Sequence, residues 1–464
     1  MRNPLPFRDT LSILASVAFA AVLAVELSAS EKPDIVLYIA DDHGRNDSSV
    51  YDPSGDAITP SMAKLASEGL TFNNAFVASP ACGPSRSALM SACWPANNGA
   101  EHNHEPPRPE TQTMVKRMQE AGYEVACFGK VHHSKWINWL GADFASPDRK
   151  NLERDVNAYL QMRKSSKPLL LIVGDTRTHA PWHPHDTYDE VDVTIPRRWV
   201  DTPDARRLWA NYLGEVTDVD TTVGNIDRMA RDHFKTDDFL FIYTSDHGHA
   251  WPFGKWNLYD WGVQVAFHAR WPGKITANTR TDAMISWIDI FPTFLDLAGE
   301  KEPDGIDGKS FAKVLRGETD QHRDFIFTAH SGDRKMNIYP IRAVRDSRFK
   351  YIRNIHPDAW HTTHTDMERR PTHGSFFSEW EQAAKTQGHA KDVIDRFHRR
   401  PAVEFYDVVK DPAETNNLAG RREYADAVKK MAKKLDDWMN ETGDTVRMEH
   451  LPYPLSEPYP GPRD

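Results

Sequence analysis

The sequence predicts an α/β protein with a large, mostly parallel, doubly wound sheet flanked by helices and a smaller C-terminal unit. Two observations favour this fold. Before about residue 330, short apolar runs rich in β-formers alternate with helical segments, which is typical of parallel sheets. After about Ser331, closely spaced strand segments precede one amphipathic helix. A chain of 464 residues is long enough for a larger unit over 31–330 and a second unit over 331–464.

The expected elements of the larger unit begin with a buried strand in PDIVLYIA. A helix follows in TPSMAKLASEG, where Thr59 is placed to cap the first turn, Pro60 fits that turn and Gly69 ends the helix. The next elements are a helix in TQTMVKRMQEAG and strands in YEVACFGK, PLLLIVGD and DDFLFIYTSD.

Polar side chains follow these strands at the points where they end. In a doubly wound sheet the ligand site lies at the carboxyl ends of the strands, so these side chains should meet at one edge. A single polar residue at a strand end is typical of an ordinary loop. Here such residues follow four strands, which favours a functional site. They are Asp41 and Asp42, Lys130 and His132, His179, and Asp246 and His247.

The second unit is expected to combine an antiparallel sheet with a terminal helix. YPIRAVRDSRFKYIRN and AVEFYDVVKDPAETNNLAG contain strand segments separated by polar turns. The helix in RREYADAVKKMAKKLDDWMNETG has an apolar face that we interpret as packing against this sheet. That face consists of Tyr424, Val428, Met431, Leu435 and Trp438. The chain then continues into a proline-rich tail, LPYPLSEPYPGPRD.

Residues 1–30 are typical of a signal peptide. Two arginines precede the apolar run LSILASVAFAAVLAVEL, and small residues at Ser28 to Ser30 favour cleavage before Glu31. The alternative is an uncleaved membrane anchor, because the run is long for a signal. We expect cleavage, a secreted or periplasmic mature protein and no membrane attachment after cleavage.

Charge and cysteine content limit the function further. The formal net charge of −10 argues against a nucleic-acid partner, although a local basic cluster can still bind an anionic substrate. The three cysteines, Cys82, Cys93 and Cys127, are too few for a disulfide scaffold and leave one unpaired. At least one cysteine is therefore expected to serve chemistry.

Cys82 stands in the stretch SPACGPSRSALMSACWP, at the expected start of a helix. Cys-Gly-Pro-Ser-Arg resembles the C-x-P-S-R signature of type I sulfatases, members of the alkaline-phosphatase-like superfamily. The blocks GKVH, HAP, SDHG and GKWNLYD match that family in order. YPIRAVRDSRFKYIRN, EFYDVVKDPAETNNLA and the final helix further resemble the subgroup that contains heparan N-sulfatase (sulfamidase).

The resemblance implies that a formylglycine-generating or equivalent maturation enzyme oxidises Cys82 to formylglycine. One hydroxyl of the aldehyde hydrate then attacks sulfur. Many relatives continue the signature with Thr-Gly-Arg, whereas this chain has Ser91-Ala92-Cys93. Of the two other cysteines, Cys93 and Cys127, the sequence allows either a pair or two buried thiols.

The carboxylates Asp41, Asp42 and Asp246 are hard oxygen ligands, and with residue 82 and His247 they predict a Ca²⁺ or Mg²⁺ site. Without a cation, carboxylates this close would repel one another, and a purely structural acidic cluster is the alternative. The resemblance implies that many relatives have Asn where this chain has His247.

The resemblance also assigns roles to basic residues. Lys130 contacts the hydrate, Lys255 and His179 hold the sulfate, and either of these two protonates the leaving atom. His132 is the base that regenerates the aldehyde, with His133 and His183 as competitors for the two histidine roles. Arg86, one helical turn after Cys82, is expected to hydrogen-bond the hydrate.

Two histidine-rich loops are candidates for binding the rest of the substrate, although such loops are equally typical of plain surface. NNGAEHNHEPP follows the nucleophile helix, and HTTHTDMERRPTHG lies in the second unit. The predicted contacts are His102, His104 and Arg370, with His361, His364 and Arg369 beside them.

These observations favour an exported, metal-dependent sulfatase that removes O-sulfate from a sulfated carbohydrate, with an N-sulfoglucosamine sulfamidase as the alternative. A phosphatase or phosphodiesterase of the same fold is more distant, because those relatives carry Ser or Thr at the nucleophile position. A non-catalytic glycan-binding protein is expected to lack some of the catalytic residues, and all are present here.

Overall fold

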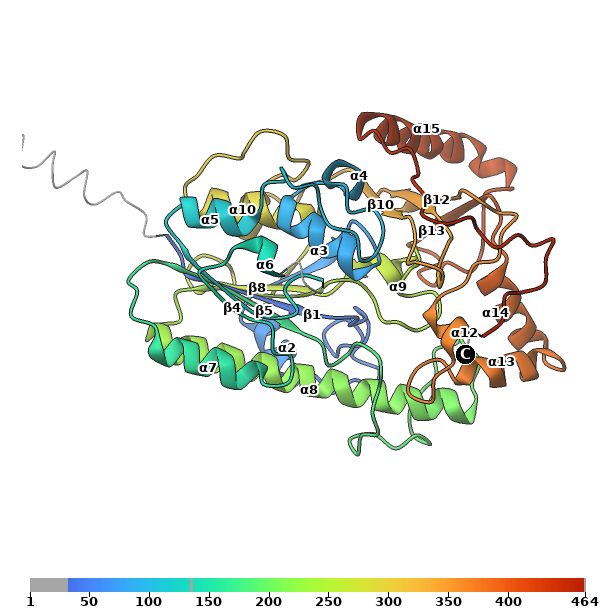
Figure 1. Cartoon of the computed structure of the whole chain (residues 1–464), viewed down its shortest axis with the longest axis horizontal. Helices are drawn as coiled ribbons and strands as arrows, with labels where there is room; N and C mark the ends of the chain where they lie inside the picture. Colours follow the sequence, from blue (N-terminus) through green and yellow to red (C-terminus); the bar gives the residue numbers. More distant parts are fainter. Residues whose placement is uncertain (1–31, 134–136, 463–464) are drawn as a thin grey trace, which may run out of the picture.

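The computed structural model describes residues 32–133 and 137–462, so the expected signal peptide lies outside the described residues (Figure 1). The larger sheet has the strand order β4-β3-β5-β1-β6-β8-β2-β7, and β9 pairs with β2. Its described strands are β1 (Ile35–Ala40), β2 (Leu70–Phe76), β3 (Glu124–Gly129), β4 (Phe144–Ser146), β5 (Leu169–Asp175), β6 (Leu240–Ser245), β7 (Gln264–Val265), β8 (Phe267–Arg270) and β9 (Thr279–Ser286).

The neighbouring strands β4, β3, β5, β1 and β6 are parallel to one another. In contrast, β8 is antiparallel to β6 and β2, and β7 is antiparallel to β2. This confirms the expected mostly parallel sheet. Ala40 of β1 is level with Asp175 of β5 and Ser245 of β6. The residues that follow these three positions therefore emerge side by side, as the sequence predicted for the carboxyl edge.

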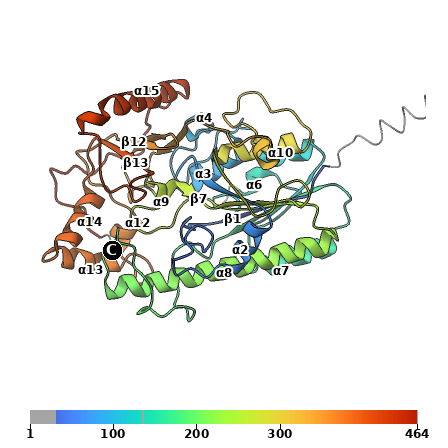
Figure 2. The same cartoon turned by 180° about the vertical axis from the view of Figure 1, so that it is seen from behind.

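Helices cover both faces of this sheet, and Figures 1 and 2 show the two layers from opposite sides. One layer contains α3 (Cys82–Ser91), α5 (Met114–Glu120) and α10 (Ile290–Leu297), and the other contains α2 (Pro60–Ser67), α7 (Leu152–Met162) and α8 (Pro203–Phe234). Shorter helical segments are α4 (Pro95–Asn98), α6 (Ile137–Leu140), α9 (Asp260–Val263), η2 (Trp287–Asp289) and α11 (Ala312–Leu315).

The core follows from the strand period of two. Ile35, Leu37 and Ile39 of β1 pack with α3, α5 and α10, while Val36 and Tyr38 pack with α2, α7 and α8. All these side chains are fully buried, because parallel strands covered by helices on both sides face no solvent. Because β1 is buried on both faces, its sequence is the continuous apolar run PDIVLYIA.

The second unit is a four-stranded antiparallel sheet in the order β10-β11-β12-β13, with helices around it. It begins at Ile326, slightly before the change expected near Ser331. Its elements are β10 (Ile326–His330), β11 (Ile341–Arg345), β12 (Phe349–Asn354), α12 (His364–Glu368), α13 (Phe376–Ala384), α14 (Gly388–His398), β13 (Val403–Asp407), η3 (Arg422–Tyr424) and α15 (Ala425–Glu441).

The final helix, α15, packs on this sheet through the predicted apolar face. Met431, Leu435 and Trp438 are buried there, and the Trp438 ring stacks on Phe327 at a centroid distance of 5.0 Å. Trp94 of the first unit also packs against Trp438, so the two units share part of a core. Among the described residues, no helix has the length and apolar character needed to cross a bilayer.

Candidate active site

The loops after β1, β3, β5 and β6 meet the start of α3 around a cavity of about 500 Å³. The second unit closes the other side of this cavity through residues near α12. Of the residues predicted from the sequence, the cavity is lined by Asp42, Cys82, His104, Lys130, His179, Lys255, His364 and Arg370.

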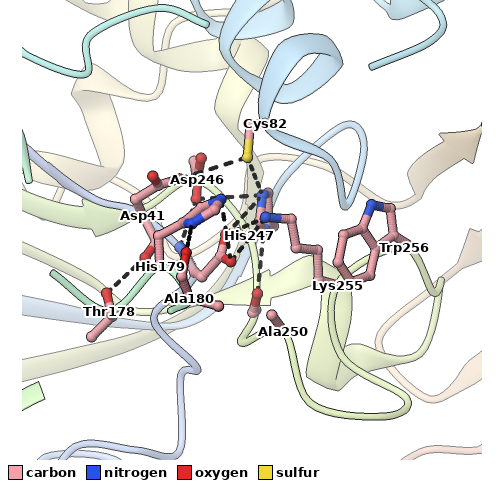
Figure 3. A network of polar contacts seen from close by, with 12 residues as sticks. Asp41, Cys82, Thr178, His179, Ala180, Asp246, His247, Ala250, Lys255 and Trp256 are labelled. Carbon is pink, nitrogen blue, oxygen red and sulfur yellow. Dashed lines mark hydrogen bonds and ion pairs between the residues drawn. The ribbon is translucent and has the colours of Figure 1, made fainter. Parts of the chain in front are cut away.

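Cys82 is the first residue of α3 and is almost fully buried, as expected from the sequence. The Asn103 side chain accepts a hydrogen bond from the Gly83 N–H at 2.9 Å and so holds the first turn. The Cys82 sulfur lies 3.3 Å from His247 Nε2 and 3.6 Å from Asp41 Oδ1 (Figure 3). It also lies 3.3 Å from Lys130 Nζ.

The surroundings of Cys82 favour negative charge at this position. Burial opposes ionisation of the thiol, but the charges of Lys130 and Lys255 outweigh it and hold the pKa of Cys82 well below its usual range. The position of residue 82 at the start of α3 adds to this effect, because the positive end of the helix dipole lies there. The geometry therefore stabilises an anionic nucleophile or a charged group bound beside it.

A buried group of potential metal ligands surrounds the sulfur. One ligand atom from each of Asp41, Asp42, Cys82 and His247 lies within 4.8 Å of the others. Asp246 is placed beside this set: its Oδ1 lies 3.6 Å from His247 Nε2, and its Oδ2 accepts a hydrogen bond from Arg86 Nε at 2.9 Å.

The residues of this group fit a divalent cation. The His247 Nδ1 lies 2.9 Å from the Gly248 carbonyl oxygen, which directs Nε2 into the cluster, as metal-binding histidines require. Burial opposes protonation of this ring, but Asp246, Cys82 and Asp42 raise the pKa of His247 to about 9. The cluster thus favours an extra positive charge, here the proton on His247. A bound metal ion would supply that charge in place of the proton.

Two lysines bridge this cluster and the cavity. Lys130 Nζ lies 2.7 and 2.6 Å from the two oxygens of Asp41, and Lys255 Nζ lies 2.8 Å from both oxygens of Asp42. Burial acts to raise the pKa of Asp41, but Lys130, His179 and Arg86 hold it well below its usual range. Asp41 is therefore held as a carboxylate, the form that binds a cation.

Arg86 is fully buried and contacts Asp246, Asp41 and the carbonyl of Lys130. The sequence predicted a contact with the hydrate at residue 82. In this structure the guanidinium contacts two carboxylates beside residue 82, and the contact with the hydrate stays a prediction.

His179 faces the same carboxylates from the loop after β5. Its Nε2 lies 4.0 Å from Asp42 Oδ2, and its Nδ1 lies 2.6 Å from the Ala180 carbonyl oxygen. Desolvation and the Lys255 charge oppose protonation, but Asp42 and Asp41 raise the pKa of His179 above its usual value. A protonated His179 next to Lys255 is placed to bind an anion and donate a proton to it.

His132 is buried and is not among the described residues that line the cavity. Its Nε2 lies 3.3 Å from Ser87 Oγ, its Nδ1 accepts the His133 N–H at 2.8 Å, and its ring packs on Trp139. The neighbouring His133 lines the cavity, with its ring 4.3 Å from that of His104. Burial lowers the pKa of both histidines to about 3, so each is a neutral proton acceptor. The base role of His132 stays a prediction.

The residues predicted to contact the substrate also divide into those that line the cavity and those that do not. His104, His364 and Arg370 line the cavity. His102 is buried beside Glu105, His361 is buried among Tyr339 and Phe397, and Arg369 pairs with Glu381. Tertiary contacts such as that between His104 and Asp333 decide this split, and sequence spacing alone does not show which histidine faces the cavity.

Sequence reasoning missed several residues of the cavity wall. Asp333 is buried and accepts hydrogen bonds from Asn103 Nδ2 at 2.8 Å and Trp256 Nε1 at 3.0 Å. Its other contacts are His104 Nε2 at 3.4 Å and His364 Nδ1 at 3.8 Å. Asp333 lies three residues after the end of β10, and this position close to a strand end was the available signal.

The remaining cysteines are free and buried. Burial raises the pKa of Cys93 to about 11 and that of Cys127 to about 12. Of the two alternatives left open by the sequence, the structure shows two separate thiols, and both are inert at neutral pH.

The fold and the cluster define a doubly wound α/β protein with a buried nucleophile position, carboxylates suited to a cation and two lysines suited to an anion. Residues 33–300 match the family model described as Sulfatase, and residues 247–396 match the model described as N-sulphoglucosamine sulphohydrolase, C-terminal. The first match spans more than half of the chain. The chain belongs to the sulfatase family and is a sulfuric ester hydrolase.

Individual relatives agree with this assignment. The chain is 29% identical over 450 residues to an ulvan-active sulfatase of Formosa agariphila, covering 94% of this chain and 86% of the relative. It is 26% identical to human N-sulphoglucosamine sulphohydrolase, covering 92% and 93% of the two chains. A solved structure in complex with its substrate D-glucosamine-2-N,6-O-disulfate has a TM-score of 0.69 at 18% identity, covering 89% of this chain and 99% of that one, and confirms the alkaline-phosphatase-like fold.

Proposed function

We propose that the protein is an exported, formylglycine-dependent sulfatase that hydrolyses an O-sulfate ester of a sulfated carbohydrate. The observation that carries this proposal is the position of Cys82. Cys82 is the first residue of α3, and its sulfur lies 3.3 Å from Lys130 Nζ. Cys82 lines the same cavity as Lys255 and His179.

The residues of the chain divide the reaction between them. Formylglycine at position 82 would supply the attacking oxygen, and a Ca²⁺ or Mg²⁺ ion held by Asp41, Asp42, Asp246 and His247 would polarise the sulfate. Lys255 and His179 bind the sulfate oxygens, and the raised pKa of His179 keeps a proton ready for the leaving oxygen. Lys130 stabilises negative charge at position 82.

The carbohydrate part of the proposal rests on the cavity and on the relatives. A cavity of about 500 Å³ accommodates one sugar ring with its sulfate, and Trp256 supplies an aromatic wall. Arg370, His104 and His364 lie around the same cavity and suit further anionic groups of such a substrate. N-sulphoglucosamine and D-glucosamine-2-N,6-O-disulfate, named for two relatives, are sulfated sugars.

A sulfamidase acting on N-sulfoglucosamine is the second candidate. The match of residues 247–396 to the C-terminal model of N-sulphoglucosamine sulphohydrolase favours it. Both reactions need the same nucleophile and cation, and they differ only in whether the leaving atom is oxygen or nitrogen.

The test is release of free sulfate from a panel of O-sulfated and N-sulfated mono- and oligosaccharides, combined with peptide mass analysis of residue 82. We expect formylglycine at position 82, activity on O-sulfated sugars, loss of activity in Cys82→Ala and retention in Cys93→Ala. Activity on N-sulfated sugars alone would select the sulfamidase. Full activity from protein that carries only the Cys82 thiol would contradict both.

A further inference from the structure

A second group of ligand-type side chains lies outside the catalytic cluster. One ligand atom from each of His102, Glu105 and Glu449 lies within 4.8 Å of the others. His102 comes from the loop after α4, and Glu449 comes from the segment after α15, more than 300 residues later in the chain. The fold therefore brings an imidazole and two carboxylates together from distant parts of the sequence.

The His102 ring is the observation that points to a ligand. Its side chain is 1% exposed, and within the described residues neither ring nitrogen makes a hydrogen bond. The nearest carboxylate oxygen, Glu105 Oε2, lies 3.5 Å from Nδ1. A buried imidazole without a partner is unfavourable, because both nitrogens lose their water without a replacement.

The charges around this ring leave room for a cation. The charges that act on the ring are those of Glu449, Glu105, Arg447 and Arg342, and Glu101 and Asp444 belong to the same charged network. Arg342 pairs with Asp444 and Glu101, and Arg447 pairs with Glu105 and Glu101, so Glu449 is the carboxylate of this network that makes no ion pair with a described residue. The ring itself is held neutral, because burial lowers the pKa of His102.

We propose that His102, Glu105 and Glu449 bind a divalent transition-metal ion, with Zn²⁺ as the best fit. One imidazole and two carboxylates, completed by water, form a common zinc ligand set, whereas Ca²⁺ prefers oxygen ligands throughout. The site is separate from the catalytic cluster and shares no residue with it.

Such an ion would fasten the segment after α15 to the wall of the active site. The loop that carries His102 continues into Asn103, which holds the Gly83 N–H at 2.9 Å, and into His104, which lines the cavity. Arg447 already links the same segment to the Gly99 carbonyl at 3.3 Å. The ion's role is therefore to position the loop, and it takes no part in the reaction.

The test measures zinc content of the full chain after equilibration with zinc chloride in excess calcium, which competes for the catalytic site. We expect wild-type protein to retain one zinc ion per chain that His102→Gln and Glu449→Gln lose. Glu441→Gln, at the exposed end of α15, and Asp42→Asn, in the catalytic cluster, are matched controls that should retain it. Cobalt in place of zinc should give visible absorption that the same two variants lose.

Limited proteolysis supplies a second measurement that does not depend on activity. Zinc should slow cleavage after α15 in wild-type protein and in Glu441→Gln, and should have no effect in Glu449→Gln. Equal zinc content in wild type, His102→Gln and Glu449→Gln would overturn the proposal. So would the absence of bound zinc in the wild type, or its loss in Asp42→Asn alone.

Discussion

Charge neutralisation among buried side chains organises the site at the scale of single residues. Three acidic groups, Asp41, Asp42 and Asp246, lie within one cluster, and each has a specific basic partner at 2.9 Å or less: Lys130, Lys255 and Arg86. Breaking one such buried pair leaves an uncompensated buried charge, which is costly. Each of these residues is therefore tied to its neighbours as well as to the reaction.

The first prediction concerns the cation. Asp42→Ala removes a ligand atom and leaves Lys255 without its partner, so we expect activity to fall by about 10²-fold or more. Chelator treatment of the wild type should have the same effect, and Ca²⁺ or Mg²⁺ should restore activity. The measurement is sulfate release with and without added metal. Recovery with zinc only would show that His247 selects a softer ion than we infer.

The second prediction separates His132 from His133. His133 lines the cavity and His132 contacts Ser87, so His133→Ala should slow turnover by about 10²–10⁴-fold, the usual contribution of a general base. A single-turnover assay should show one burst of desulfated sugar followed by a stall. His132→Ala should behave like the wild type if its role is packing against Trp139. A burst and stall in His132→Ala with normal turnover in His133→Ala would restore the assignment made from the sequence.

At the scale of helices and strands, hydrogen bonds at the ends of helices and turns keep the elements of the site in place. The short helix η2 packs against α3, and its Asp289 accepts hydrogen bonds from the Ser286 N–H, the Lys309 N–H and Arg323 Nε. The long-range contacts of this buried anchor cannot be read from the sequence, because Lys309 and Arg323 lie 20 and 34 residues further along the chain.

The third prediction uses this anchor. Asp289→Asn removes the charge that pairs with Arg323, and loss of a buried ion pair should lower the free energy of unfolding by about 3–5 kcal/mol. Burial acts to raise the pKa of Asp289, but Arg323 and His322 hold it below the usual range. The stabilisation is therefore complete above about pH 4, the ordinary carboxyl pKa, and declines as the pH falls further.

The measurement is urea unfolding of both proteins between neutral and acid pH. The difference between wild type and Asp289→Asn should shrink on the acid side, while the exposed Asp320→Asn should match the wild type throughout. A constant difference at all pH values would mean that Asp289 acts through shape and hydrogen bonding without its charge.

At the scale of the whole molecule, the parts that were predictable are those with a local pattern. Continuous apolar runs marked β1, β3, β5 and β6, and the 3.6-residue period marked α15. The short strands β7 and β8 have no such pattern, because their pairing with β2 and β6 comes from contacts far apart in sequence. Which of His102 and His104 faces the cavity likewise depends on a tertiary contact, the one between Asp333 and His104.

The fourth prediction concerns export. The described fold begins at Lys32, whose Nζ lies 2.8 Å from the Ala121 carbonyl and 3.0 Å from Glu300 Oε1. A chain that starts at Glu31 keeps these contacts and all others of the described fold, so cleavage before Glu31 should leave folding intact. We expect protein expressed without residues 1–30 to have the melting temperature and activity of the secreted form. N-terminal sequencing of the exported protein should give Glu31 or a neighbouring residue. An exported protein that keeps residues 1–30 and stays with the membrane fraction would establish the anchor alternative.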